Sequence, residues 1–245
     1  MRSAFLLASF LFAAGAAHAG PAALTSLHNN DGESALMPLD EPADHGGIAR
    51  AVTAVEMLRS LARDDGRDVL VLSSGDNFLA GVAREASTRD AIDYDARALA
   101  AIGYDAIALG NHDFDFGPAA LAAFIGYAEG GQAVLADVPF LAANLDFAGE
   151  PALAALAADG RLVASTVVRR GDHAYGVIGA ITERLPAISS PGAVAVGDFA
   201  APVRAEVAVL ADAGVDKTIL VSHLQGLARD VAILRAILSL SRDLR

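Results

Sequence analysis

Short apolar segments alternate with longer helical patterns along most of this 245-residue chain, and that alternation is its strongest constraint on fold. The short segments are rich in Val, Ile, Leu and Ala and are bounded by Gly or polar residues, which is typical of buried strands. They are Ala23–Leu27, Val69–Ser73, Ala106–Leu109, Phe140–Ala143 and Thr218–Val221. The helical patterns are Ile48–Arg63, Asp90–Ile102, Ala119–Tyr127 and Val203–Ala213. This order predicts a layered α/β domain.

One pair of neighbouring segments predicts antiparallel strand pairing. Val163–Arg169 and Tyr175–Ile181 flank a short turn that contains Gly171-Asp172. Two strand-like segments joined by a turn of this kind predict an antiparallel hairpin. The sheet structure is therefore expected to be mixed.

The N-terminus has the features of a signal peptide. Arg2 precedes an apolar run from Ala4 to Ala17, and Ala17-His18-Ala19 supplies the small residues of an A-x-A-type cleavage site. The run is too short to span a membrane comfortably. We expect residues 1–19 to be removed on export to the periplasm or the cell exterior. The mature protein, residues 20–245, is expected to carry no membrane anchor.

Composition excludes several classes of function. The chain has no Cys, so it forms no disulfide and has no thiolate nucleophile or zinc-thiolate site. Its formal net charge is −12, which argues against nucleic-acid binding that depends on neutralising phosphates.

Polar clusters follow four of the predicted strands. They are Asn29-Asn30-Asp31-Gly32-Glu33, Ser74-Gly75-Asp76-Asn77, the group Asn111-His112-Asp113 with Asp115, and Ser222-His223. Each cluster alone is compatible with an ordinary polar turn or, for the last, with a buried histidine. Together they indicate a shared site, because strand ends of an α/β sheet meet in one crevice. Carboxylate, amide and imidazole groups suit a divalent cation.

The order of these motifs resembles the calcineurin-like metallophosphatase superfamily, specifically its 5′-nucleotidase branch. The resemblance runs from about Leu24 to about Asp230 and includes His45-Gly46-Gly47-Ile48-Ala49-Arg50 and Phe140-Leu141-Ala142-Ala143-Asn144. It implies a layered α/β/β/α sandwich with mixed sheets and a site for two divalent ions. The implied function is an exported metal-dependent phosphoesterase that hydrolyses phosphate monoesters such as nucleotides.

The resemblance also implies roles for individual residues. Asp76 would bridge two metal ions, Asp31 would bind one of them, and Asn111 the other. His223 would match a later histidine ligand. His112 and Asp115 would form the catalytic pair, in which the carboxylate orients the imidazole. The imidazole would then stabilise charge or donate a proton to the leaving oxygen.

Two departures from the family pattern carry consequences. Glu33 stands where the family usually has His; it either binds metal, favouring Mn²⁺, Mg²⁺ or Ca²⁺ over Zn²⁺, or points into solvent. The chain has no His after His223, whereas the family continues to a Gly-His-x-His motif and a separate nucleotidase domain. The remaining sequence predicts an amphipathic helix over residues 228–240.

From these departures we expect a fold that is incomplete at its C-terminus, as in a truncated or frameshifted product, with a minimal natural variant as the alternative. Its unpaired sheet edge favours self-association. Two other functions stay open. One is a degenerate domain that binds metal with little or no catalysis, and the other is an exported solute-binding module.

Overall fold

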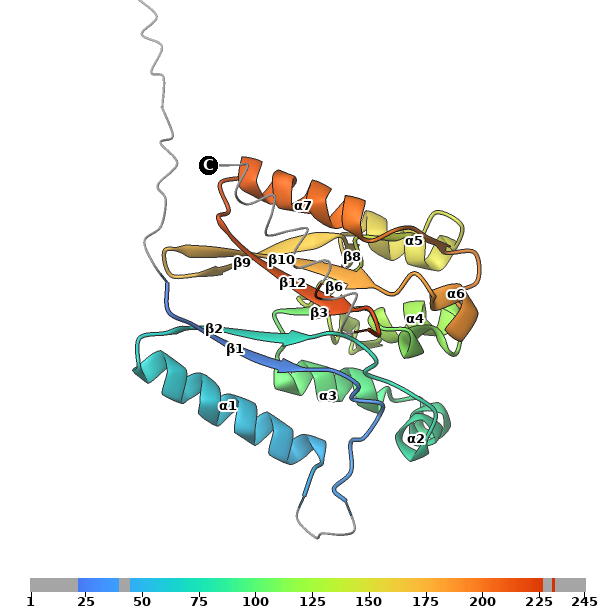
Figure 1. Ribbon diagram of the computed structural model, residues 1–245. Helices are drawn as coiled ribbons and strands as arrows, with labels where there is room; N and C mark the ends of the chain where they lie inside the picture. Colours follow the sequence, from blue (N-terminus) through green and yellow to red (C-terminus); the bar gives the residue numbers. More distant parts are fainter. Residues whose placement is uncertain (1–21, 40–44, 227–230, 232–245) are drawn as a thin grey trace, which may run out of the picture.

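The structure is a computed structural model that describes residues 22–39, 45–226 and Val231 (Figure 1). The predicted signal peptide, residues 1–19, lies outside the described residues. The helix predicted over 228–240 also lies outside them, apart from Val231. Within the described part of the chain, no helix is both long and apolar enough to cross a membrane.

The first sheet has five parallel strands in the order β1-β2-β3-β6-β8. They are β1 (Leu24–Asn29), β2 (Asp68–Ser73), β3 (Ala106–Ala108), β6 (Phe140–Leu141) and β8 (Leu162–Val163). In the register of this sheet, Asn29 pairs with Ser73 and Ser73 with Ile107. The carboxyl ends of the first three strands therefore lie at one edge of the sheet.

The second sheet has three strands in the order β12-β10-β9. Strands β9 (Ser165–Arg170) and β10 (His173–Ile181) form the predicted antiparallel hairpin. Strand β12 (Lys217–His223) runs parallel to β10, and His223 pairs with Ile181 at the end of both strands. The sheet structure is mixed, as the sequence predicts.

Helices cover the outer faces of both sheets, with α1 and α3 along the first sheet and α7 along the second, while α2 and α6 lie beyond the strand ends (Figure 1). The helices are α1 (Ile48–Asp64), α2 (Val82–Asp90), α3 (Tyr94–Ile102), α4 (Pro118–Ile125), α5 (Pro151–Ala158), α6 (Leu185–Ile188) and α7 (Ala200–Asp212). The smaller elements are the 3₁₀ turn η1 (His112–Phe114) and the two-stranded pairs β4 (Ala128–Glu129) with β5 (Gln132–Ala133) and β7 (Leu145–Asp146) with β11 (Ala195–Val196).

Three apolar layers hold the fold together. Alternate residues of β2 face opposite sides, so Val71 packs toward helices α1, α3 and α4 while Leu72 packs between the two sheets. Strand β10 repeats the pattern: Val177 lies between the sheets and Ile178 packs toward α7. The result is the α/β/β/α sandwich that the family resemblance implies.

One predicted helix is wrong in its bounds. The segment Asp90–Ile102 forms the end of α2 and then α3, which begins at Tyr94. Ala91 adopts a left-handed conformation with φ of 53° that ends α2, and Asp93 caps α3 by accepting a hydrogen bond from the Ala96 N–H at 2.9 Å. The helices α5 and α6, and all of α2 before Asp90, were not predicted from the sequence.

Candidate metal centre

The polar loops that follow β1 and β2 are joined by backbone hydrogen bonds. The Asp31 N–H donates to the Gly75 carbonyl oxygen at 3.1 Å, and the Glu33 N–H donates to the Asp76 carbonyl oxygen at 2.9 Å. Asp31, Glu33 and Asp76 have φ of 52°, 44° and 55°, in the left-handed region that non-glycine residues rarely adopt. Strained backbone of this kind concentrates at functional sites, where the surrounding structure holds it in place.

The loops after β2 and β3 approach each other so closely that both need glycine. A Cβ on Gly110 would lie 2.1 Å from Asp76 Oδ1, and a Cβ on Gly75 would lie 2.2 Å from the Gly110 nitrogen. Gly75 also has φ of 98°. The Gly-Asp and Gly-Asn pairs of the two motifs therefore bring the Asp76 carboxylate against the start of the next loop.

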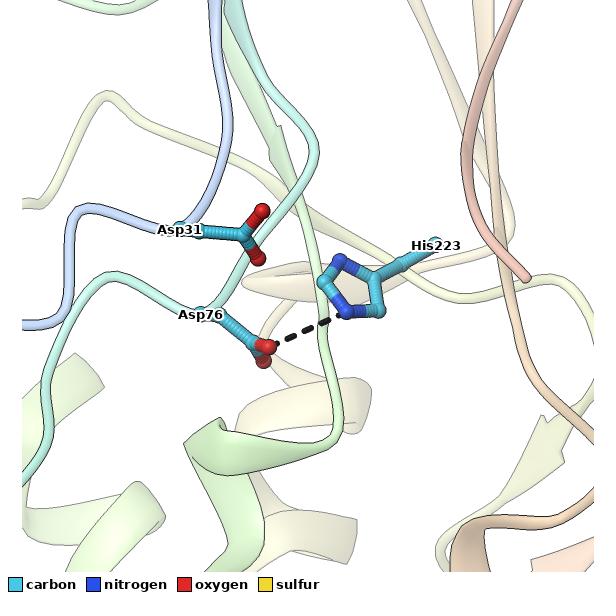
Figure 2. A group of neighbouring side chains, drawn as sticks. All are labelled: Asp31, Asp76 and His223. Atoms are coloured by element: carbon cyan, nitrogen blue, oxygen red, sulfur yellow. Dashed lines mark ion pairs between the residues drawn. The ribbon is translucent and has the colours of Figure 1, made fainter. Parts of the chain in front are cut away.

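Asp31, Asp76 and His223 bring one ligand atom each into a group whose members all lie within 4.8 Å of one another. Figure 2 shows the two carboxylates on neighbouring loops, with the His223 ring reaching them from the end of β12. Asp76 is only 1% exposed, whereas Asp31 is exposed, so the group opens to solvent on one side. Two carboxylate oxygens and an imidazole nitrogen suit a divalent cation.

The hydrogen bonds of His223 show how the group would accept such an ion. His223 Nδ1 lies 2.8 Å from the Ser74 carbonyl oxygen, so Nδ1 carries a hydrogen and donates it. Nε2 then meets two oxygens, Asp76 Oδ2 at 3.0 Å and Asn111 Oδ1 at 3.1 Å. Contact between Nε2 and these oxygens requires a proton or a cation between them, and the donor set therefore fits a metal ion.

The charge state of His223 depends on opposing effects. Its burial lowers the imidazole pKa, but the hydrogen bond and negative charge of Asp76, with smaller contributions from the Ser74 carbonyl and Asp31, raise the pKa above its usual 6.5. In the absence of a metal ion, the two oxygens at 3.0 and 3.1 Å favour a proton on Nε2. Metal binding would release this proton.

His112 and Asp115 form a second pair beside this group. His112 Nδ1 lies 2.6 Å from Asp115 Oδ2, and the two side chains are 35% and 27% exposed. The His112 backbone N–H donates to Asp76 Oδ1 at 2.7 Å, which ties the pair to the metal group. The hydrogen bond to Asp115 raises the His112 pKa, burial opposes it, and the charges of Asp76, Asp115 and Glu33 add to the rise.

Asp113 has a role that the sequence did not reveal. Its buried carboxylate accepts hydrogen bonds from the backbone N–H groups of Gly110 at 2.8 Å, Asp76 at 3.2 Å and Asn77 at 3.2 Å. Burial raises the Asp113 pKa to about 7, with the charge of Asp76 adding to the rise and the three N–H donors opposing it. Asp113 therefore links the loops after β2 and β3. The only signal in the sequence was one more acid beside His112.

The predicted site residues do not all lie equally near the centre. Asn111 is buried, and its Oδ1 also accepts a hydrogen bond from Gln225, two residues beyond β12. Glu33 is exposed, and among the described residues the three-membered group does not include it. The Glu33 carboxylate still raises the His112 pKa, so it lies within electrostatic reach of the pair. Metal binding by Glu33 stays a prediction.

The chain is similar in sequence and in structure to 5′-nucleotidases. No family model matches the chain. The 5′-nucleotidase of Diplobatis ommata is 32% identical over 232 residues, which are 89% of this chain and 36% of that relative. The crystal structure of a 5′-nucleotidase precursor from Thermus thermophilus matches with a TM-score of 0.70 and 31% identity, covering 86% of this chain and 38% of that one.

A calcineurin-like phosphoesterase of Bacillus subtilis shares the fold, with a TM-score of 0.61 and 21% identity, over 81% of this chain and 61% of that one. The chain spans about a third of the length of the curated relatives, at 36%, 29% and 34% of the first three.

Proposed function

Because the chain belongs to the 5′-nucleotidase branch of the calcineurin-like metallophosphatase superfamily, we propose that it is a metal-dependent phosphoesterase that hydrolyses phosphate monoesters such as nucleotides. One observation carries this proposal. The Asp31, Asp76 and His223 ligand atoms lie within 4.8 Å of one another, directly beside the His112–Asp115 pair. A cation site next to an oriented imidazole suits hydrolysis better than simple binding of a solute.

Two divalent ions would be held by the residues of the metal centre. Asp76 would bridge them, as the family resemblance implies; its Oδ2 lies 3.0 Å from His223 Nε2, and its Oδ1 accepts the His112 N–H at 2.7 Å. Asp31 would bind one ion and Asn111 the other, with His223 and Glu33 as further ligands. The ions, as Mn²⁺, Zn²⁺, Mg²⁺ or Ca²⁺, would supply activation of a water and neutralisation of charge on the phosphoryl oxygens.

His112 would act on the leaving oxygen of the ester. Asp115 accepts the Nδ1 hydrogen at 2.6 Å, which leaves Nε2 as the nitrogen that can give a proton to substrate. The Asp115 contact raises the His112 pKa, which favours the protonated ring that a proton donor requires. A general acid placed in this way contributes roughly 10²- to 10⁴-fold to the rate.

The proposal includes export. Residues 1–19 have the sequence features of a signal peptide, and residues 20–245 would form the metallophosphatase-like domain. Expression with the natural N-terminus in a bacterial host, followed by N-terminal sequencing of the exported fraction, should give Gly20 as the first residue. An intact Met1 on protein retained in the cytoplasm would contradict export.

Self-association through the second sheet also belongs to the proposal. Strand β12 is the last strand of this sheet among the described residues, and only β10 pairs with it there. An unpaired strand edge can pair with another copy of the chain. Light scattering on the purified protein should give a mass above that of one chain, and a strict monomer would contradict this part of the proposal.

Metal content and phosphate release test the function together. The purified protein, loaded with Mn²⁺, should hold about two ions per chain and release phosphate from adenosine monophosphate, and a chelator should abolish the release. One ion or none, with no phosphate release, would favour the degenerate metal-binding domain. That alternative is supported by Glu33, which the described structure leaves outside the metal group.

The chain offers a matched control for the catalytic pair. His173 Nδ1 lies 2.6 Å from Asp68 Oδ2, the same distance as in the His112–Asp115 pair, but at the opposite ends of β10 and β2 from the metal centre. His112→Ala should reduce phosphate release by roughly 10²-fold or more, while His173→Ala should leave it nearly unchanged. Equal losses in the two variants would contradict the role of His112.

A further inference from the structure

Both oxygens of the Asp115 carboxylate have a partner. Oδ2 holds His112 Nδ1 at 2.6 Å, and Oδ1 accepts a hydrogen bond from Ser189 Oγ at 2.8 Å. A carboxylate accepts and does not donate, so the Ser189 hydroxyl is the donor. One hydroxyl therefore fixes the plane of the carboxylate that holds the imidazole.

The Ser189 hydroxyl and the Asp115 carboxylate come from segments that follow strands of different sheets. His112 and Asp115 follow β3 of the first sheet, whereas Ser189 follows β10 of the second sheet and ends α6, beside α4 (Figure 1). The Ser189 N–H donates to the Leu185 carbonyl oxygen at 3.0 Å, which anchors the residue on the α6 turn. The position of Ser189 is thus set by the fold.

The rest of the loop is packed against the start of α4. A Cβ on Gly192 would lie 2.3 Å from Glu150 Oε1 and 2.8 Å from Pro118 Cγ, and Gly192 has φ of 63°. The Ala193 N–H donates to the same Glu150 oxygen at 2.6 Å. Because Pro118 begins the helix that follows Asp115 by three residues, this packing keeps the loop of Ser189 beside the segment that carries Asp115.

We propose that Ser189 is a positioning residue that orients Asp115, and through it the His112 proton donor, toward the leaving oxygen. The inference rests on the proposed phosphoesterase function. Without the hydroxyl, the carboxylate can rotate about its Cβ–Cγ bond, and the imidazole loses a fixed acceptor for its Nδ1 hydrogen. Ser189 acts on the reaction only through Asp115 and does not touch substrate.

The step that depends on this orientation is proton transfer to the leaving group. Hydrolysis joins a water oxygen to phosphorus and breaks the ester P–O bond, and the leaving oxygen takes the proton from His112 Nε2. A proton from the attacking water later restores the imidazole, while Asp115 keeps its negative charge throughout. A poor leaving group needs this proton, whereas a stabilised phenolate leaves without it.

Two substrates separate positioning from a general structural effect. We expect Ser189→Ala to lower kcat for adenosine monophosphate by about 10-fold with little change in KM, and to change kcat for 4-nitrophenyl phosphate by less than about 2-fold. Ser189→Thr keeps the hydroxyl and should retain activity on both esters. Ser190→Ala, at the exposed neighbouring serine, is the matched control and should resemble the unmodified protein.

Equal losses on the two esters, or no loss on adenosine monophosphate, would overturn the inference. If the unmodified protein hydrolyses neither ester, the proposed function fails, and the positioning role is read from the ¹⁵N spectrum of labelled histidine at constant pH. The His112 Nδ1 signal should show a hydrogen-bonded N–H that changes in Ser189→Ala and not in Ser190→Ala. An unchanged His112 signal in Ser189→Ala would also overturn the inference.

Discussion

Replacing Asp113 with Ala would remove the common acceptor of three backbone N–H groups that hold the loops of the metal centre. The Gly110 and Asp76 N–H groups donate to Oδ2 at 2.8 and 3.2 Å, and the Asn77 N–H donates to Oδ1 at 3.2 Å. Asp113 is 3% exposed, so water cannot take its place without local opening. The Asp113→Ala chain must leave these groups without partners or let the loops separate.

The expected loss follows from the number of groups that are left without acceptors. A buried N–H group without a partner costs about 1–3 kcal/mol, so three of them cost about 3–9 kcal/mol. We expect about 4 kcal/mol, near the lower end, because loop opening would admit water and because Ala also removes a carboxylate whose pKa burial raises to about 7. Such a loss is a large part of the 5–15 kcal/mol that typically stabilises a domain.

Urea unfolding followed by circular dichroism, with a chelator present, measures this loss without a contribution from metal. Asp113→Asn keeps one acceptor oxygen and should lose less stability than Asp113→Ala. Asp172→Ala, in the exposed turn between β9 and β10, is the control and should change the free energy of unfolding by less than about 0.5 kcal/mol. A loss below about 1 kcal/mol for Asp113→Ala would refute the reasoning.

Three further predictions concern the metal ligands, the glycine beside Asp76, and the buried Asp95 carboxylate of α3. Asp76→Ala should remove bound metal and activity together, whereas His112→Ala should keep its metal content, and equal metal loss by elemental analysis would contradict separate roles. Gly110→Ala places a Cβ 2.1 Å from Asp76 Oδ1 and should abolish metal binding in a titration, while Gly81→Ala, whose Cβ meets open space, should not. Burial and the charge of Asp93 raise the Asp95 pKa from 3.8 to about 6, against smaller opposing effects of Ser34 and Arg84. The Asp95 carboxylate therefore binds a proton more tightly in the folded state than in the unfolded state. Stability should therefore fall by about 3 kcal/mol between about pH 4 and 6, and Asp95→Asn should flatten that slope in urea unfolding.

The sequence predicted the strands and the order of the layers well because their signal is local. Seven of the described strands, β1, β2, β3, β6, β9, β10 and β12, were placed to within a few residues, since aliphatic segments bounded by polar residues mark both ends of a buried strand. The break between α2 and α3 was missed because it depends on a left-handed Ala91 and a cap by Asp93, which helical periodicity does not report.

The site could be predicted only in part for a related reason. Asp31 and Asp76 follow the ends of β1 and β2, and His223 ends β12, so the strand order brings the three side chains together. The roles of Asp113 and Ser189 depend on hydrogen bonds to residues up to 37 and 74 positions away in the sequence, respectively. No spacing rule specifies contacts of that kind, since they are set by how the two sheets and their loops pack.

The metal centre itself is tested most directly by anomalous diffraction from crystals of the protein grown with Mn²⁺. The structure predicts an anomalous peak within about 2.0–2.6 Å of oxygens of Asp31 and Asp76 and of His223 Nε2, with a second peak across the Asp76 carboxylate beside Asn111. A well-ordered crystal with these side chains in place and no peak among them, or with manganese bound only elsewhere, would contradict the account.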